Sequence, residues 1–303
     1  MSTTGGQTDS MDTILKRLGD SPIGGIFSLL MVWFGLALGH TQVVLQHSSL
    51  PMGLLDTSLS WILGFGGFAL VWIGLKRPEE QATILGYIGG SLIWCGFFEW
   101  TWRYFGHWLG IEPIMDQGMM ILSPELLMIQ ATTLIVLSML IFLGANKDTR
   151  CRMFMWFHRN FKLRPGRQTA GYKRQHARTA AIETVFLVWT IYLFAIFIND
   201  PRGIKYDSIL AMVLTGGFVV WGIYLVNKLL KIRGLGPAFR YAIPTGSICW
   251  LPIEAFARWG LYPEIWVMPK EYTGLMSVVL ILFVVGVVGM YKTEQDQVVE
   301  ATA

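Results

Sequence analysis

Long apolar segments constrain this chain more than any other feature of its sequence. Eight of them approach the roughly 20 residues that a helix needs to cross the hydrocarbon core of a bilayer. Of the 303 residues, 53% are hydrophobic and only 15% are charged, whereas about a quarter of a soluble domain is charged. We therefore predict an all-α polytopic membrane protein with eight transmembrane helices. The predicted segments are 22–45, 57–75, 82–109, 121–143, 180–198, 207–230, 240–261 and 272–290.

The basic residues predict how the chain is oriented. Lys16 and Arg17 precede the first segment, and Lys76 and Arg77 follow the second. The positive-inside rule then places both termini in the cytoplasm, in the inner or an intracytoplasmic cell membrane. No nucleic acid partner is predicted, because the cations belong to loops that flank the bilayer. The central loop holds most of them against a single acid, Asp148: Lys147, Arg150, Arg152, Arg159, Lys162, Arg164, Arg167, Lys173, Arg174 and Arg178.

This central loop, residues 146–179, admits two interpretations. It is predicted to lie against anionic lipid as a determinant of orientation. Apolar residues at 153–157 stand among the arginines, which indicates a short interfacial helix. Binding of a partner protein is the alternative.

The two halves of the chain are predicted to be a duplication. Residues 31–33 match 187–189, 66–68 match 216–218, and 90–94 match 246–250, with offsets between 150 and 156. Each half has four segments, an even number, so both halves would enter the membrane from the same side as parallel repeats. The predicted parts are a polar tail at 1–21, a first repeat at 22–145, the basic linker at 146–179, a second repeat at 180–291, and a tail at 292–303.

Charged residues inside two of the apolar segments are the strongest functional indication. Glu99 and Arg103 lie four residues apart, as do Glu254 and Arg258, so each set shares one helix face. Charged groups are costly inside a bilayer and are predicted to face the bundle interior or water. One interpretation is an ion pair within each helix that fixes packing. The other is a polar site between the repeats that binds an anion or a proton, or that holds a neighbouring subunit.

A second polar group gathers on the predicted non-cytoplasmic side of the first half. Imidazole, carboxylate and thioether groups together are ligands for copper, and thioethers favour Cu(I). The alternative is a set of scattered interfacial polar residues with methionines that fill gaps. The candidate copper ligands are His40, His47, Asp56, His107, Glu112, Asp116, Met119 and Met120.

One aromatic stretch resembles a known family. Residues 98–105, Phe-Glu-Trp-Thr-Trp-Arg-Tyr-Phe, are followed by Trp108. They resemble a segment at the end of a transmembrane helix in the A subunit of the copper-dependent membrane monooxygenases, which act on methane or ammonia. The resemblance extends over residues 84–143. It implies a membrane subunit beside a copper-bearing partner, with packing or subunit-contact roles for Glu99, Trp100, Arg103 and Tyr104.

This chain also departs from that family. Phe98 stands where the family motif has glycine, the family's A subunit is shorter, and it has no four-plus-four duplication. The best-supported metal ligands of the family belong to other subunits. The resemblance therefore transfers no catalytic residue.

Three hypotheses follow. The first is an integral membrane subunit, mainly a scaffold, of a multi-subunit copper monooxygenase-like complex; whether the chain is itself catalytic stays open. The second is a small-molecule or ion transporter built from parallel repeats, with the Glu and Arg residues lining its path. The third is a membrane assembly or structural factor. The lipid bilayer and partner membrane subunits are the expected partners, and homo-oligomerisation stays open.

Overall fold

The computed structural model describes residues 20–116, 118–145, 148, 155, 158–164 and 166–302. Within these ranges, the side chains at 119, 140, 142–145 and 292–302 lie outside the description. Most of the predicted interfacial helix at 153–157, most of the N-terminal tail and part of the basic linker also lie outside the described residues. The protein is mostly helical, as the apolar segments predicted.

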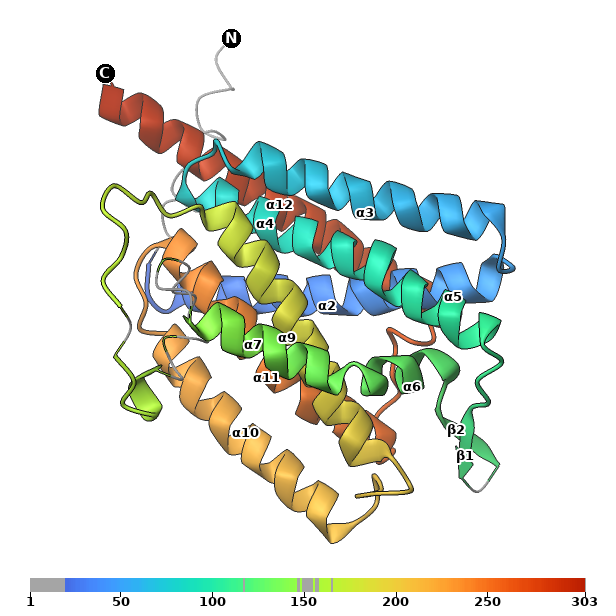
Figure 1. Ribbon diagram of the computed structural model, residues 1–303. Coiled ribbons are helices and arrows are strands. Elements are labelled where there is room, and N and C mark those ends of the chain that lie inside the picture. The colour runs from blue at the N-terminus through green and yellow to red at the C-terminus, as the bar shows by residue number, and fades with distance from the viewer. Residues whose placement is uncertain are drawn as a thin grey trace.

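Long helices run side by side between two ends of the molecule (Figure 1). A short π-helix, η1, connects α4 to α5, so that Glu79–Trp108 forms one continuous helical rod. The helices are α2 Ile23–Ser49, α3 Leu54–Gly74, α4 Glu79–Ile93, η1 Trp94–Glu99, α5 Trp100–Trp108, α6 Pro124–Ala131, α7 Thr133–Ala145, α9 His176–Asn199, α10 Ile209–Leu229, α11 Leu235–Arg258 and α12 Thr273–Thr302.

Six helices of the described chain are long and apolar enough to cross a membrane. They are α2, α3, the α4–α5 rod, α9, α10 and the Thr273–Tyr291 part of α12. The other two predicted segments are less regular. The fourth is divided at Thr132 into α6 and α7, and the seventh, α11, contains Pro244 and Pro252. Each proline removes a backbone N–H donor from the helical hydrogen bonds of α11. The charged residue Arg240 lowers the mean hydropathy of the same helix. Eight crossings therefore stay a prediction.

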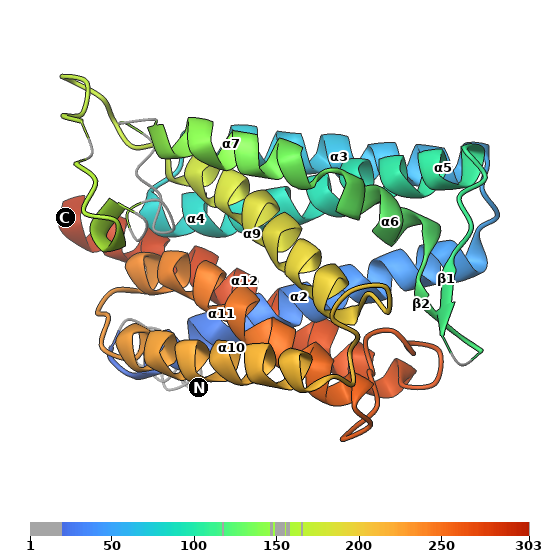
Figure 2. The ribbon, with the colours of Figure 1, turned by 60° about the horizontal axis from the view of Figure 1, so that its bottom comes forward.

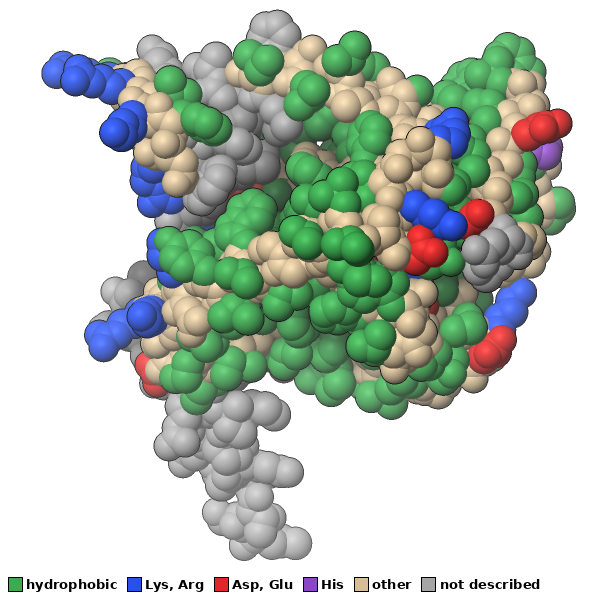
Figure 3. Space-filling view, turned by 90° about the horizontal axis from the view of Figure 1, so that it is seen from below, with side chains coloured by type: hydrophobic (Ala, Val, Ile, Leu, Met, Phe, Trp, Pro, Cys, Tyr) green, Lys and Arg blue, Asp and Glu red, His purple; other side chains and the backbone are tan. Residues whose placement is uncertain are grey.

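The two ends of the helical bundle differ in composition. Figures 1 and 2 place the start of α2 and the end of α12 at one end, together with the connections from α7 to α9 and from α10 to α11. We call this the basic end, because Lys and Arg side chains gather there (Figure 3). The side chains between the two ends are largely hydrophobic in the same view. The opposite end carries the connections after α2, α5, α9 and α11 and is called the hairpin end. The apolar outer faces of the helices contact the lipid bilayer.

A small β-hairpin interrupts the otherwise helical fold. Strand β1, Ile114–Asp116, pairs antiparallel with β2, Met119–Leu122, between α5 and α6. Gly118 takes a φ of 81° in the turn, a conformation that glycine adopts without strain. Lys205, which precedes α10, contacts Asp116 at 3.1 Å and so ties the hairpin to the second half of the chain. The prediction of helices alone did not include this hairpin.

The helices α4 and α11 form the centre of the bundle. Helix α4 packs mainly on α3 and α9, and α11 packs on α10 and α2. A Cβ atom on Gly86 of α4 would lie 2.2 Å from the Ala177 carbonyl oxygen, so only glycine permits this approach of α9. Gly216 and Gly217 of α10, in contrast, face open space within 4 Å. Glycine therefore permits close helix packing at α4, whereas these two glycines of α10 make no such contact.

This contrast gives a stability test. Gly86→Ala should lower the free energy of unfolding by about 1–3 kcal/mol, because α4 and α9 must separate to admit the methyl group. Gly217→Ala is the matched control and should leave stability unchanged or raise it by about 0.5–1 kcal/mol, the usual benefit of alanine in a helix. Thermal unfolding in detergent measures both. Equal effects of the two substitutions would contradict the described packing of α4 on α9.

Candidate functional site

A cavity of about 300 Å³ lies between the two halves of the chain, near the hairpin end. Its walls come from α2, η1, β2, α6, α9, α11 and the connection that follows α11. Most of the wall is apolar, which makes the few His, Glu and Arg side chains that line it distinctive. They are His40, His47, Glu99, Glu125, Glu254, Arg258 and Glu264.

Glu254 of α11 is held by two neighbours at this cavity. The indole nitrogen of Trp250, one turn earlier, donates a hydrogen bond of 2.6 Å to its carboxylate. The imidazole Nε2 of His40, from α2, lies 3.2 Å from the same oxygen. The carboxylate of Glu254, in the second half of the chain, therefore reaches across to the first helix of the first half.

Glu99 of η1 has a matching arrangement. The indole nitrogen of Trp94 donates a hydrogen bond of 2.9 Å to the Glu99 carboxylate, and the Tyr192 hydroxyl of α9 also bonds it. Trp94 precedes its glutamate by five residues, whereas Trp250 precedes Glu254 by four. A π-helical turn, whose hydrogen bonds run from i to i+5, accommodates that additional residue. The two carboxylates thus receive the same kind of donor although their spacings differ.

Aromatic rings connect the two carboxylate sites. The His40 imidazole stacks against Tyr192 with ring centroids 5.8 Å apart and against Trp250 at 5.9 Å. Tyr192 also lies 5.5 Å from the ring of Trp94. The His40 imidazole therefore lies between two aromatic rings and beside the carboxylate of Glu254.

The loop after α11 adds charged groups at the rim of the cavity. Burial raises the pKa of the Glu264 carboxyl above its ordinary value, and the nearby Arg258 guanidinium opposes that shift. Arg258 also lies within electrostatic range of Glu254. Glu125 lines the cavity from the first turn of α6, where the helix dipole favours an acid. Four carboxyl groups and one guanidinium therefore line the cavity, which favours a cation or protons as occupant.

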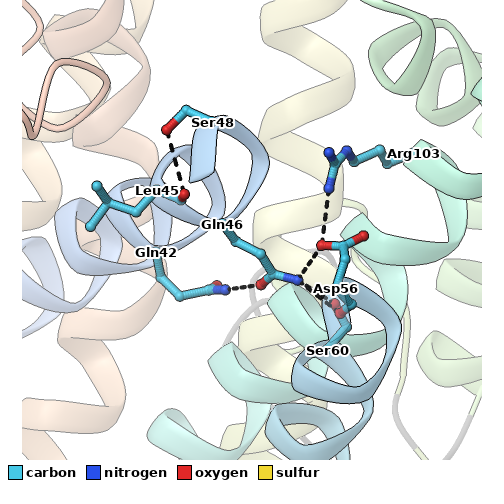
Figure 4. Close-up of polar contacts among 7 residues, drawn as sticks. All are labelled: Gln42, Leu45, Gln46, Ser48, Asp56, Ser60 and Arg103. Carbon is cyan, nitrogen blue, oxygen red and sulfur yellow. Dashed lines mark hydrogen bonds and ion pairs between the residues drawn. The ribbon is translucent and has the colours of Figure 1, made fainter. Parts of the chain in front are cut away.

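Arg103 belongs to a separate network beside the cavity (Figure 4). Its guanidinium pairs with Asp56 of α3 at 3.1 Å, and Asp56 is completely buried. Gln46 of α2 donates hydrogen bonds to Asp56 Oδ1 at 2.7 Å and to Ser60 at 2.6 Å, and Gln42 donates to Gln46. Among the described residues, the ion-pair partner of Arg103 is thus Asp56 rather than Glu99. An ion pair within the helix is not what holds Glu99.

The candidate copper ligands are distributed over several places. His40 and His47 line the cavity, Asp56 pairs with Arg103, and Asp116 pairs with Lys205. The other candidates with described side chains are exposed: His107, Glu112 and Met120. The Met119 side chain lies outside the description. Within the described part of the chain, no three His, Cys, Asp or Glu residues form a group that could hold a metal ion.

Several residues of the site could not be identified from sequence spacing alone. Tyr192, Trp94 and Trp250 were not candidates, although all three contact one of the cavity's ionisable side chains. A tryptophan one helical turn before each glutamate was the available signal. The link from His40 to Glu254 joins residues more than two hundred positions apart, and no local pattern predicts such a contact.

The chain matches no known family model, no curated protein and no solved structure.

The pairing of Arg103 can be tested by double-mutant cycles. Asp56→Asn should lower the free energy of unfolding by about 3–5 kcal/mol, because it leaves a mostly buried guanidinium without its anion. Arg103→Gln should cost less in the Asp56→Asn background than alone, since contacting residues couple. The cycle of Arg103→Gln with Glu99→Gln serves as the control and should be additive. Coupling of Arg103 to Glu99 instead of Asp56 would contradict the network.

Proposed function

We propose that this chain is a membrane carrier that moves a small molecule together with protons bound between its two halves. The observation that supports it most is that Glu99 and Glu254, one from each half, line the same cavity. Charged groups inside a bilayer are costly and typically mark substrate, ion or proton paths. His40, bonded to Glu254 and stacked on Tyr192, places an imidazole, a group that can take up and release a proton, beside that carboxylate.

The proposal includes two parallel repeats. The sequence offset between the halves is 156 at Trp94 and Trp250 and 155 at Glu99 and Glu254. The change of one residue coincides with η1, whose wider turn holds one additional residue. The packing supports the same relation, because the third segment of each half packs on the first helix of the other: α4 on α9, and α11 on α2. A two-fold axis along the membrane normal would produce this reciprocal packing of the two halves.

We further propose eight crossings with both termini in the cytoplasm. Helices α6 and α7, of 8 and 13 residues joined by Thr132, together reach about 33 Å at 1.5 Å per residue. Helix α11, of 24 residues, reaches about 36 Å by the same rise. Both lengths suffice for a hydrocarbon core of about 30 Å. With the basic end in the cytoplasm, the cell membrane or an intracytoplasmic membrane is the proposed location.

The route toward the basic end is closed in the described conformation. A cluster of buried apolar side chains from α2, α4, α9 and α11, including Val32, Ile84, Leu187 and Ile243, fills that half of the bundle. Beyond it, Arg240 of α11 pairs with Glu79 of α4 at 2.7 Å. A carrier with its cavity near one surface and a packed core below it corresponds to one of the two states that alternating access requires.

Proton binding at the cavity can be measured without knowing the substrate. Proteoliposomes adsorbed on a sensor should give a transient charge displacement when the external pH is stepped, because protons enter sites within the membrane. Glu254→Gln should remove most of the displaced charge, and Glu99→Gln should reduce it. Glu112→Gln changes an exposed carboxylate and is the matched control. An unchanged transient in Glu254→Gln and Glu99→Gln would contradict a proton site between the halves.

The membrane subunit of a copper monooxygenase-like complex is the second candidate. The observation that favours it is the aromatic end of α5, where Tyr104, Phe105 and Trp108 are exposed beside one another. Exposed aromatic side chains that gather in one place are typical of contacts between proteins. In this case the aromatic cluster would face a copper-bearing partner subunit, and the cavity would be structural.

Copurification distinguishes the two candidates. A complex of this kind, purified in mild detergent from its own membrane, should contain partner polypeptides and copper. Trp108→Ser should then reduce the yield of partners, because it removes the exposed anchor of the aromatic cluster. Trp72→Ser on α3 is the control, since Trp72 is equally exposed at 70% compared with 68% for Trp108. A homogeneous, metal-free preparation of the wild-type chain would contradict the subunit hypothesis.

A further inference from the structure

A second, larger space lies on the other side of α2 from the central cavity. This crevice has a volume of about 790 Å³ and is bounded by α2, α3, α4, η1 and α12. Its mouth includes Leu45, Leu59, Leu280 and Val284, whose side chains are between 38% and 50% exposed. These residues lie on helices whose outer faces contact lipid, so the crevice opens toward the acyl chains of the bilayer rather than toward water.

A small void connects the walls of the crevice to the walls of the central cavity. It measures about 30 Å³, which is room for about one water molecule. Gly35, Gly39, Ser91 and Cys95 line both the void and the crevice. On its other side the void shares four residues with the central cavity: His40, Val43, Glu99 and Tyr192. The three spaces therefore form a series that passes between α2 and α4.

Two small residues determine how narrow this passage is. A Cβ atom on Gly39 would lie 3.7 Å from the Cys95 sulfur, so the gap between them admits one methyl group in ordinary contact and little more. A leucine at position 39 would extend into the void from α2. Cys95 lies opposite, on η1, and a phenylalanine there would fill the same space from the other helix. We call the stretch between Gly39 and Cys95 the neck.

The charge at the neck selects the kind of molecule that fits. Among the described residues, Glu99 is the one carboxylate that lines the void, and neither Lys nor Arg lines it. Arg258 lines the central cavity but not the void. A head group that donates hydrogen bonds or carries positive charge is therefore favoured beside Glu99, while the crevice accommodates an apolar chain.

We propose that the ligand of this protein is a lipid-soluble amine that enters sideways from the bilayer, with its alkyl chain in the crevice and its amine at Glu99. The route requires the neck between Gly39 and Cys95 to widen, since it now holds about one water. The inference rests on the proposed function, because Glu99 lines the cavity that is proposed to bind protons. It adds the chemical class of the ligand and the direction from which the ligand enters.

Photolabelling of the full chain in proteoliposomes tests this route. The probe is a long-chain alkylamine with a diazirine beside the amine, added to the lipid, and labelled peptides are mapped by mass spectrometry. The wild type should be labelled at Glu99 and at the crevice wall near Phe283. Gly39→Leu should lose the Glu99 label and keep the crevice label. Gly66→Leu, a glycine of α3 with no neighbour within 4 Å, is the matched control and should keep both.

Two further probes define the ligand class and the direction of entry. An alkyl sulfate of the same chain length, with the same diazirine beside its head group, should label the crevice but not Glu99. Labelling of Glu99 by this sulfate as strong as that by the amine would overturn the amine assignment. A short, water-soluble amine with the same diazirine should label Glu99 weakly. Strong labelling by this short amine that persists in Gly39→Leu would overturn entry from the bilayer.

A second variant protects the test against misfolding. If Gly39→Leu fails to assemble, as judged by gel filtration and thermal unfolding, Cys95→Phe narrows the neck from the opposite helix and should give the same loss. Absence of Glu99 labelling in the wild type would overturn the lateral route. The proposed function would nevertheless stand if pH steps still moved charge in a manner that depends on Glu254.

Discussion

The hydrogen bond from a tryptophan indole to a glutamate, made once in each half, is the interaction on which this arrangement depends. A carboxylate inside a bilayer loses its hydration, and the loss is tolerable only when donors replace water. Trp94 serves Glu99 and Trp250 serves Glu254, each from the preceding turn of the same helix. Because the donor and the acceptor belong to one helix, their geometry is maintained as that helix moves. Each carboxylate can accept further hydrogen bonds, and these come from the cavity and from residues of the opposite half.

This arrangement explains why the segment around Glu99 contains a π-helix whereas α11, around Glu254, is α-helical. With α-helical geometry, a tryptophan five residues before Glu99 would point to a different face of the helix. The wider turn of η1 restores the contact that α11 makes with a four-residue spacing. π-helical turns are rare and occur frequently at functional sites, which agrees with the position of η1 in the cavity wall. The same turn brings Gly96 close to the backbone of Ser60 and Gly64 in α3, where no larger residue would fit.

The sequence predicted the helical membrane class more successfully than it predicted the partners of the charged residues. Hydropathy and segment length depend on local composition, so these could be inferred from the chain alone. A four-residue spacing places Glu99 and Arg103 on one face, but the buried carboxylate of Asp56 is the stronger partner for the guanidinium. Likewise, Asp116 was grouped with His40 and His47 as a candidate ligand, but its carboxylate contacts Lys205 in the other half, whereas the two histidines line the cavity. These pairings depend on tertiary contacts between distant segments, which the spacing of residues along the sequence cannot predict.

The central claim is that Glu99 and Glu254 face one shared interior space. Spin labels placed at both positions of a variant that lacks the native cysteines, in lipid vesicles, measure this directly through dipolar broadening and through accessibility to lipid-soluble oxygen. The account predicts strong broadening between the two labels and low accessibility to oxygen at each. Well-separated labels, or labels as accessible to oxygen as one at Trp72 on the lipid-facing surface of α3, would contradict it.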